Sequence, residues 1–146
     1  MEALKLKNRH LIPLGNWLAT LELSGSDSRK RTRFVVALQG RLDEMEKERI
    51  KLAEKYCKKN NKGKPKMKKD ASGQQVYDFS KENRDKFANE MNEYFEEDYV
   101  LDVLDSNKEE LKAIKDVVLN TEEKFSGRQA TEYDEWCEAF EALNLD

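Results

Sequence analysis

Apolar residues recur at alternating steps of three and four between residues 26 and 61, which is the spacing of one face of a helix. The positions that make up this stripe are Phe34, Leu38, Leu42, Met45, Leu52 and Tyr56. We therefore expect one long amphipathic helix, and we expect the other elements of the chain to be organised around it.

Two short stretches have the pattern of β-strands. Residues 3–7 alternate apolar and basic side chains, as a half-buried strand does. Residues 99–104 have the length and the β-branched content of a second strand. We expect these two strands to pair with each other.

The other apolar patterns have helical spacing. A helix that begins near Ile12 can hold Pro13 in its first turn. Three more helices are expected in the second half of the chain, each after a residue type that caps helix N-termini. The expected caps are Ser80, Ser106 (in a capping box with Glu109) and Ser126.

A basic stretch with Asn, Gly and Pro separates the long helix from the next one. It predicts two short strands, at about residues 65–69 and 74–79, joined by a turn at residues 70–73. Residues 61–79 are therefore predicted to form a projecting basic hairpin. Because an isolated hairpin is marginally stable, it leans on the helices, stays mobile or becomes ordered against a partner.

These patterns together predict an α+β fold that is mostly α, with about four to five helices around the long helix, a small β-hairpin and a short N-terminal strand. The 146 residues fit a single domain spanning residues 1–146. Apolar residues make up 38% of the chain and charged residues 39%, so the core must be lean.

Candidate chemistry is sparse. Cys57 and Cys137 lie far apart with only His10 as a further soft ligand, so we expect reduced thiols and no zinc site. His10 has no Ser or Asp at a recognisable motif spacing, and we expect it at the surface or at a helix cap. No metal, cofactor or catalytic residue is predicted, and we expect no enzyme.

No stretch approaches the ~18 apolar residues of a membrane span, and the N-terminus lacks the apolar core of a signal peptide. We therefore expect no membrane partner and a cytoplasmic location.

The net charge of −3 hides an asymmetry between the two halves of the chain. Residues 1–70 contain 19 Lys and Arg against 9 Asp and Glu, whereas residues 71–146 contain 8 against 21. Three explanations of this asymmetry are open. The opposite charges of the two halves pair within the fold, they pair between neighbouring copies, or one half binds a partner of opposite charge.

Candidate partner-binding residues follow from this asymmetry. Basic side chains at the start of a helix are unfavourable for its dipole, and so are acidic side chains at the end of one, which suggests that each set meets something of opposite charge. The basic candidates are Arg29, Lys30, Arg31 and Arg33 in the long helix and Lys64, Lys66, Lys68 and Lys69 in the hairpin. The acidic candidates are Glu93, Glu96, Glu97, Asp98, Asp102 and Asp105.

Three groups of short motifs carry a resemblance. They are Leu6-Lys7-Asn8 with Leu11-Ile12-Pro13, then Ser28-Arg29 with Arg31-Thr32-Arg33-Phe34-Val35, and then Phe125-Ser126-Gly127 with Ala130, Tyr133-Asp134, Cys137-Glu138 and Phe140. In combination they resemble a small uncharacterised protein family of phages and prophages of Gram-positive bacteria, over nearly the whole chain. The resemblance implies a phage origin and a gene near the tail and lysis genes, and it transfers no catalytic residue.

We therefore expect a non-enzymatic phage protein that acts by protein–protein binding. The first hypothesis is an accessory of virion or tail morphogenesis, bound to a phage structural protein or to further copies of itself. The second is an inhibitor of a host defence system such as a CRISPR nuclease, with an acidic face that imitates nucleic acid. The third is a nucleic-acid-binding accessory that uses residues 29–33 and 58–69. The expected location is the bacterial host cytoplasm during infection, or the virion.

Overall fold

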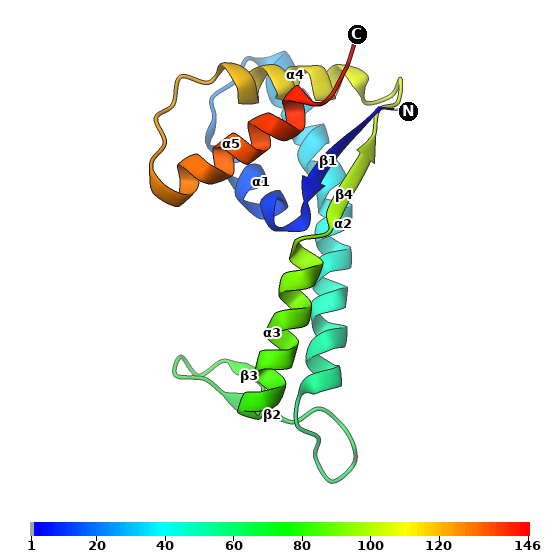
Figure 1. The fold of residues 1–146 in the computed structure, drawn as a ribbon, viewed down its shortest axis with the longest axis vertical. Coiled ribbons are helices and arrows are strands. Elements are labelled where there is room, and N and C mark those ends of the chain that lie inside the picture. Colours follow the sequence, from blue (N-terminus) through cyan, green and yellow to red (C-terminus); the bar gives the residue numbers. More distant parts are fainter. Residues whose placement is uncertain (1) are drawn as a thin grey trace. The chain divides into compact units, whose positions relative to one another are not determined.

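The computed structural model describes residues 2–146, and contacts within the chain divide them into two compact units (Figure 1). The terminal unit holds the described residues up to Leu42 together with Glu97–Asp146, and the middle unit is Asp43–Glu96. The longest helix, α2 (Gly25–Tyr56), begins in the terminal unit and ends in the middle unit. The expectation of a single domain over residues 1–146 stays a prediction.

The predicted fold class is confirmed. Residues 2–146 form an α+β fold that is mostly α, with five α-helices and two antiparallel sheets of two strands each. Its long helix, its N-terminal strand and its hairpin lie where the apolar patterns place them. Among these residues no helix is both long enough and apolar enough to cross a membrane.

The predicted pairing of the first strand is also confirmed. β1 (Ala3–Lys7) runs antiparallel to β4 (Asp98–Asp102), with Leu4 opposite Leu101 and Leu6 opposite Tyr99. Leu4 and Leu6 are buried while the residue between them is exposed, as the alternating pattern requires. This sheet places one face on the core of the terminal unit.

Helices cover the rest of the terminal core. A 3-10 turn (Asn8–His10) leads into α1 (Leu11–Thr20), and α4 (Lys108–Asn120) and α5 (Gly127–Glu141) follow β4. Their apolar stripes pack with the first part of α2, because each helix has one apolar face. The largest fully buried side chains are Trp136, Phe34, Phe140, Leu4, Leu6, Leu11, Leu14, Leu18, Leu38, Leu111, Ile114 and Leu143.

The start of α4 corrects one prediction. The N-cap is Asn107 rather than Ser106, and no capping box forms. The Asn107 amide accepts a hydrogen bond from the Leu104 N–H (2.8 Å) and donates one to the Asp102 carbonyl (2.9 Å). An amide has both a donor and an acceptor group, so the Asn107 side chain can make both hydrogen bonds that close the turn after β4. The Ser106 side chain makes neither of them.

The middle unit is built from the end of α2, a hairpin and α3 (Lys81–Phe95). The predicted hairpin is present, with shorter strands β2 (Met67–Lys69) and β3 (Gln75–Tyr77). Ser80 caps α3 as expected, since its hydroxyl accepts a hydrogen bond from the Asn83 N–H (3.2 Å). The buried apolar side chains of this unit are few, namely Met45, Leu52, Ala53, Cys57 and Met91.

Replacing Phe140 tests the packing of the terminal unit. Phe140 is fully buried, with its ring centroid 6.4 Å from that of Phe34, so Phe140→Ala should lower the free energy of unfolding by about 3–5 kcal/mol. Both tryptophans of the chain belong to this unit, so urea denaturation followed by tryptophan fluorescence reports on it. Val36→Ala is the control, because Val36 is 66% exposed and should change stability by less than about 0.5 kcal/mol. Equal losses in the two variants would contradict this packing.

Candidate functional site

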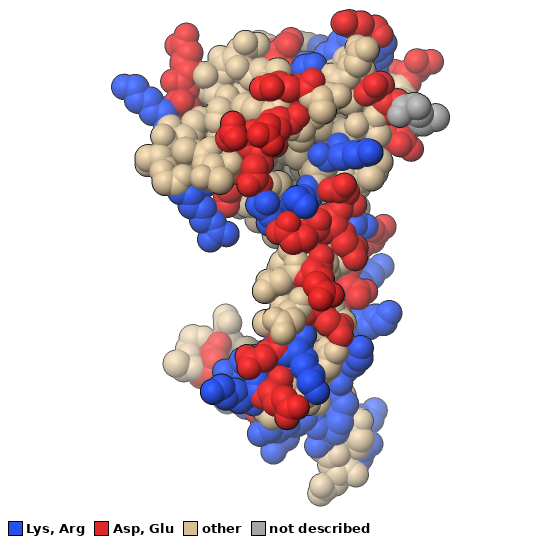
Figure 2. Space-filling view, in the orientation of Figure 1, with Lys and Arg blue, Asp and Glu red and all other residues tan. Residues whose placement is uncertain are grey.

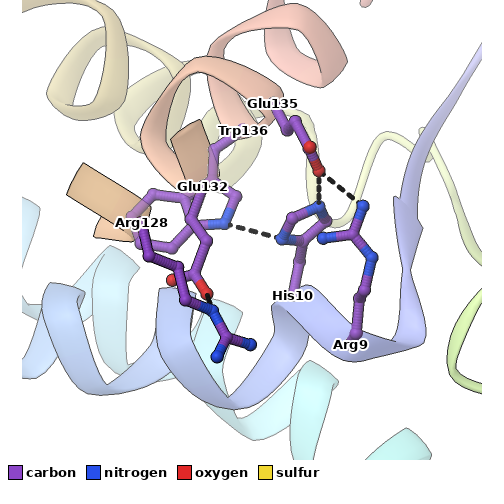
Figure 3. A network of polar contacts seen from close by, with 6 residues as sticks. All are labelled: Arg9, His10, Arg128, Glu132, Glu135 and Trp136. Carbon is purple, nitrogen blue, oxygen red and sulfur yellow. Dashed lines mark hydrogen bonds and ion pairs between the residues drawn. The ribbon is translucent and has the colours of Figure 1, made fainter. Parts of the chain in front are cut away.

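His10 is the only histidine of the chain, and the sequence suggested a position at the surface or at a helix cap. Its side chain is instead buried, with 3% of the residue exposed. His10 ends the 3-10 turn before α1, and its ring meets two neighbouring residues of α5 (Figure 3). Its Nε2 lies 2.6 Å from Glu135 Oε2, and Trp136 Nε1 donates to its Nδ1 over 3.2 Å. The surface alternative was wrong because both partners lie more than a hundred residues away in sequence. The capping alternative holds for position only, since His10 is the N-cap residue of α1 but its side chain makes no capping hydrogen bond.

The hydrogen bonds assign the protonation of the ring. An indole N–H can only donate, so His10 Nδ1 must accept, and the ring proton sits on Nε2 and is donated to Glu135. Burial, followed by the charge of Arg9, lowers the pKa of His10, against the opposing effect of Glu135. The buried ring is therefore held in its neutral form.

The carboxylate of Glu135 joins this ring to a cation. Arg9 Nη2 donates to Glu135 Oε2 over 2.7 Å. Burial raises the pKa of Glu135, but the hydrogen bonds from Arg9 and His10 outweigh it and leave the pKa below its ordinary value. Along α5, Arg128 forms an ion pair with Glu132 (3.3 Å), which lies near the indole in the same view (Figure 3).

Both ring nitrogens of His10 are engaged, so this histidine has no free lone pair for a metal ion or for proton abstraction. The network instead ties the start of α1 to α5, with Trp17 and Trp136 packed at a centroid distance of 5.6 Å. Among residues 2–146, no three His, Cys, Asp or Glu side chains are placed to hold a metal ion. Cys57 and Cys137 are free thiols.

The basic candidates at the start of α2 have two different environments. The Arg31 guanidinium donates to the carbonyls of Leu18 (2.9 Å) and Leu21, at the C-terminal end of α1. Arg33 lies 3.9 Å from Glu110 in the first turn of α4. These two arginines thus compensate charge within the terminal unit. Arg29 is exposed, and Lys30 half-buried, beside them.

The acidic candidates are divided between the units. Glu93 and Glu96 lie at the end of α3 in the middle unit, and the other four belong to the terminal unit. On β4, Asp98 and Asp102 are exposed, but Lys7 of β1 stands directly opposite Asp98. The outer face of this sheet therefore carries both signs of charge.

The terminal unit contains a groove that the sequence did not indicate. It has a volume of about 520 Å³ and lies where the end of α1, the start of α2 and the second half of α4 meet. The described residues that line it include no Lys or Arg. Its apolar side chains are Leu21, Leu23, Ala113 and Val117, and its carboxylates are those of Glu22, Asp27, Asp116 and Glu123. We call it the acidic groove.

In the middle unit, residues 58–78 fold as a meander of three short extended segments. The Lys66 N–H donates to the Lys58 carbonyl (2.8 Å), and the Asp78 N–H donates to the Lys66 carbonyl (2.9 Å). Lys59 and Pro65 form an isolated antiparallel bridge, so the first segment pairs with the second as β2 pairs with β3. We call these residues the lysine meander.

Two turns of the same design hold the meander. In the first, the Asn60 side chain accepts hydrogen bonds from the N–H groups of Lys62 (2.9 Å) and Lys64 (3.1 Å). In the second, the Asp70 side chain accepts from Ser72 (2.9 Å) and Gln74 (3.0 Å) in the same way.

Each turn places a glycine three residues after its Asx residue, in the left-handed region, with φ of 75° at Gly63 and 86° at Gly73. The turn at residues 70–73 was predicted, and the same Asx-x-x-Gly spacing at residues 60–63 could have predicted the other turn.

Alternation along these segments places most of the lysines on one face. Lys58, Lys64, Lys66 and Lys68 share this face with Asp78, whereas Lys69 points to the other side. Lys58 Nζ and Lys68 Nζ each lie 3.8 Å from Asp78 Oδ1. We call these four lysines and Asp78 the lysine face. Basic side chains are exposed over this part of the middle unit (Figure 2).

Comparisons of the chain with protein families, with curated proteins and with solved structures found no match.

The titration of His10 gives a prediction for the terminal unit. Because the pKa of His10 is lowered from 6.5 in the fold, the unfolded chain binds a proton more readily below that pH. Stability should be full above about pH 6.5 and should fall as the pH drops further. Urea denaturation followed by tryptophan fluorescence, at about pH 7.5 and about pH 5.5, measures this loss.

His10→Gln is the control, because it removes the titrating ring. The variant should be less stable at both pH values and should lose less stability than the wild type when the pH is lowered. Equal losses in both proteins would show that His10 does not control this pH dependence.

Proposed function

We propose that this chain is a non-enzymatic phage protein that acts by binding another protein, as an accessory of virion or tail morphogenesis. The phage setting rests on the resemblance of its short motifs to a phage and prophage family. The binding rests on the acidic groove of the terminal unit. The proposal of a non-enzymatic role is supported by His10, whose two ring nitrogens are both engaged in holding α1 and α5 together.

The lining of the groove defines the chemistry of its occupant. Leu21, Leu23 and Val117 are half-buried and offer apolar contact, while the carboxylates around them favour a basic partner. A volume of about 520 Å³ accommodates a few side chains of a segment, not a folded surface. The occupant that fits is a basic, partly apolar segment of a phage structural protein.

Before any partner arrives, one of the carboxylates is held in place and the charge of a second is stabilised. Trp17 Nε1 donates to Glu123 Oε2 over 2.9 Å, which fixes the position of that side chain. Asp27 lies in the first turn of α2, where the helix dipole favours a negative charge. Such preorganisation lowers the entropy lost on binding.

The inhibitor hypothesis has less support from the geometry. A nucleic-acid mimic needs a continuous acidic face, and on the β1–β4 sheet Lys7 stands opposite Asp98. Glu93 and Glu96 belong to the other unit.

Affinity capture from phage-infected host lysate tests the proposed function. The bait pair is wild type and a charge-reversed groove variant, Glu22→Arg with Asp116→Arg, both at exposed positions. The matched control reverses two exposed carboxylates of the same unit outside the groove, Asp134→Arg with Glu141→Arg. Wild type and control should recover a virion or tail protein, identified by mass spectrometry, and the groove variant should recover at least about tenfold less.

Equal recovery by the groove variant would contradict the groove as the binding site. Recovery of a host nuclease in place of virion proteins would overturn the morphogenesis proposal in favour of an inhibitor. Absence of any phage protein from the wild-type capture would also contradict the proposal.

A further inference from the structure

The lysine face is a second surface that the proposed function does not use. It holds four ammonium groups and one carboxylate, and so carries a net positive charge; the ammonium groups of Lys58 and Lys68 are the two that lie 3.8 Å from Asp78. The side chains of Lys64 and Lys66 are exposed and have no ion-pair partner in the described chain. These charges contribute nothing to the core of the middle unit.

The face is formed without a partner. The turns at residues 60–63 and 70–73 close by their own side-chain and backbone hydrogen bonds, which sets the register of the three segments. The reverse side of the meander is anchored, because Tyr77 packs on Phe79 (6.5 Å), which stacks on Phe87 of α3 (5.2 Å). The lysines are therefore presented on an ordered support.

The composition of the face favours nucleic acid over an acidic protein. The cores of protein–protein interfaces are depleted of lysine and depend on aromatic or arginine anchors. The aromatic side chains of this region, Tyr77 and Phe79, are engaged on the reverse side. A phosphate backbone requires only regularly spaced positive charges, and lysine supplies them as point charges.

The spacing of the lysines fits the same ligand. Lys66 and Lys68 alternate along one extended segment, so their side chains leave the backbone about 6.6 Å apart, and Lys64 precedes them at the bend after Gly63. This is close to the separation of successive phosphates along a nucleic-acid strand. Because no aromatic side chain stacks bases on this face, a duplex suits it better than a single strand.

We propose that the lysine face binds the phosphate backbone of a nucleic-acid duplex without regard to base sequence. It is a site in the middle unit, separate from the acidic groove of the terminal unit, and its test is independent of protein capture. It gives the hairpin lysines Lys64, Lys66 and Lys68 a defined role and leaves Lys69 outside the site.

A pair of charge reversals on one segment tests the proposal. Lys66→Glu and Lys69→Glu change the charge equally, three residues apart, on opposite sides of the meander. The probe is a fluorescent DNA duplex of about 20 base pairs with random sequence, titrated with the full chain at about 50 mM salt and read by fluorescence anisotropy. Wild type should bind, Lys66→Glu should weaken binding at least about tenfold, and Lys69→Glu should weaken it less than about threefold.

Three further variants add measurements whose expected results misfolding would not produce. Lys66→Ala should lower the slope of log affinity against log salt by about 1, whereas Lys69→Ala should leave the slope unchanged. Asp78→Asn removes the carboxylate of the face and should tighten binding. Far-UV circular dichroism checks that all variants keep the helices.

Three results would overturn the proposal. Wild type without affinity for the duplex at low salt would leave the lysines with the structural role of protecting strand edges from aggregation. Equal losses for Lys66→Glu and Lys69→Glu would mean diffuse attraction without a binding face. Tighter binding to a polyglutamate peptide than to the duplex would identify an acidic protein as the partner.

Discussion

The hydrogen bond from the Trp136 indole to the ring of His10 is the interaction on which the terminal unit depends. It joins residues 126 positions apart and brings α5 against the start of α1. On the solvent side of the His10 ring, Arg9 and Glu135 neutralise each other. The uncharged ring can therefore be buried although charged side chains lie next to it. A chain with 39% charged residues needs such pairing where its apolar stripes end.

The two units differ in how far apolar packing stabilises them. The terminal unit surrounds a core of aromatic and leucine side chains, whereas the middle unit buries only Met45, Leu52, Ala53, Cys57 and Met91. Its meander is held by side-chain turns and, on one side, by the ring contacts of Tyr77, Phe79 and Phe87. As a result each unit has a charged surface that takes no part in its packing. This surface is the acidic groove in the terminal unit and the lysine face in the middle unit. The charge asymmetry of the sequence does not follow the units, since Glu22 and Asp27 of the basic half line the acidic groove.

Local patterns in the sequence predicted the elements well and the site poorly. The alternation at residues 3–7 and the turn at residues 70–73 are local signals, and both were confirmed. The burial of His10 was missed because its environment is set by α5, which no local pattern connects to it. The lysine face required the register of two turns, since one residue of slippage moves Lys66 to the opposite side. The acidic groove combines three segments distant in sequence, so only their packing reveals it.

The lysine face that we propose as a nucleic-acid site is confined to the middle unit. Amide NMR spectra of the isotope-labelled full chain, recorded during titration with a short DNA duplex, test it most directly. We expect the amide signals of residues 58–78 to shift progressively while the indole signals of Trp17 and Trp136 stay in place. Shifts centred on the terminal unit, or no shift at all at low salt, would contradict it.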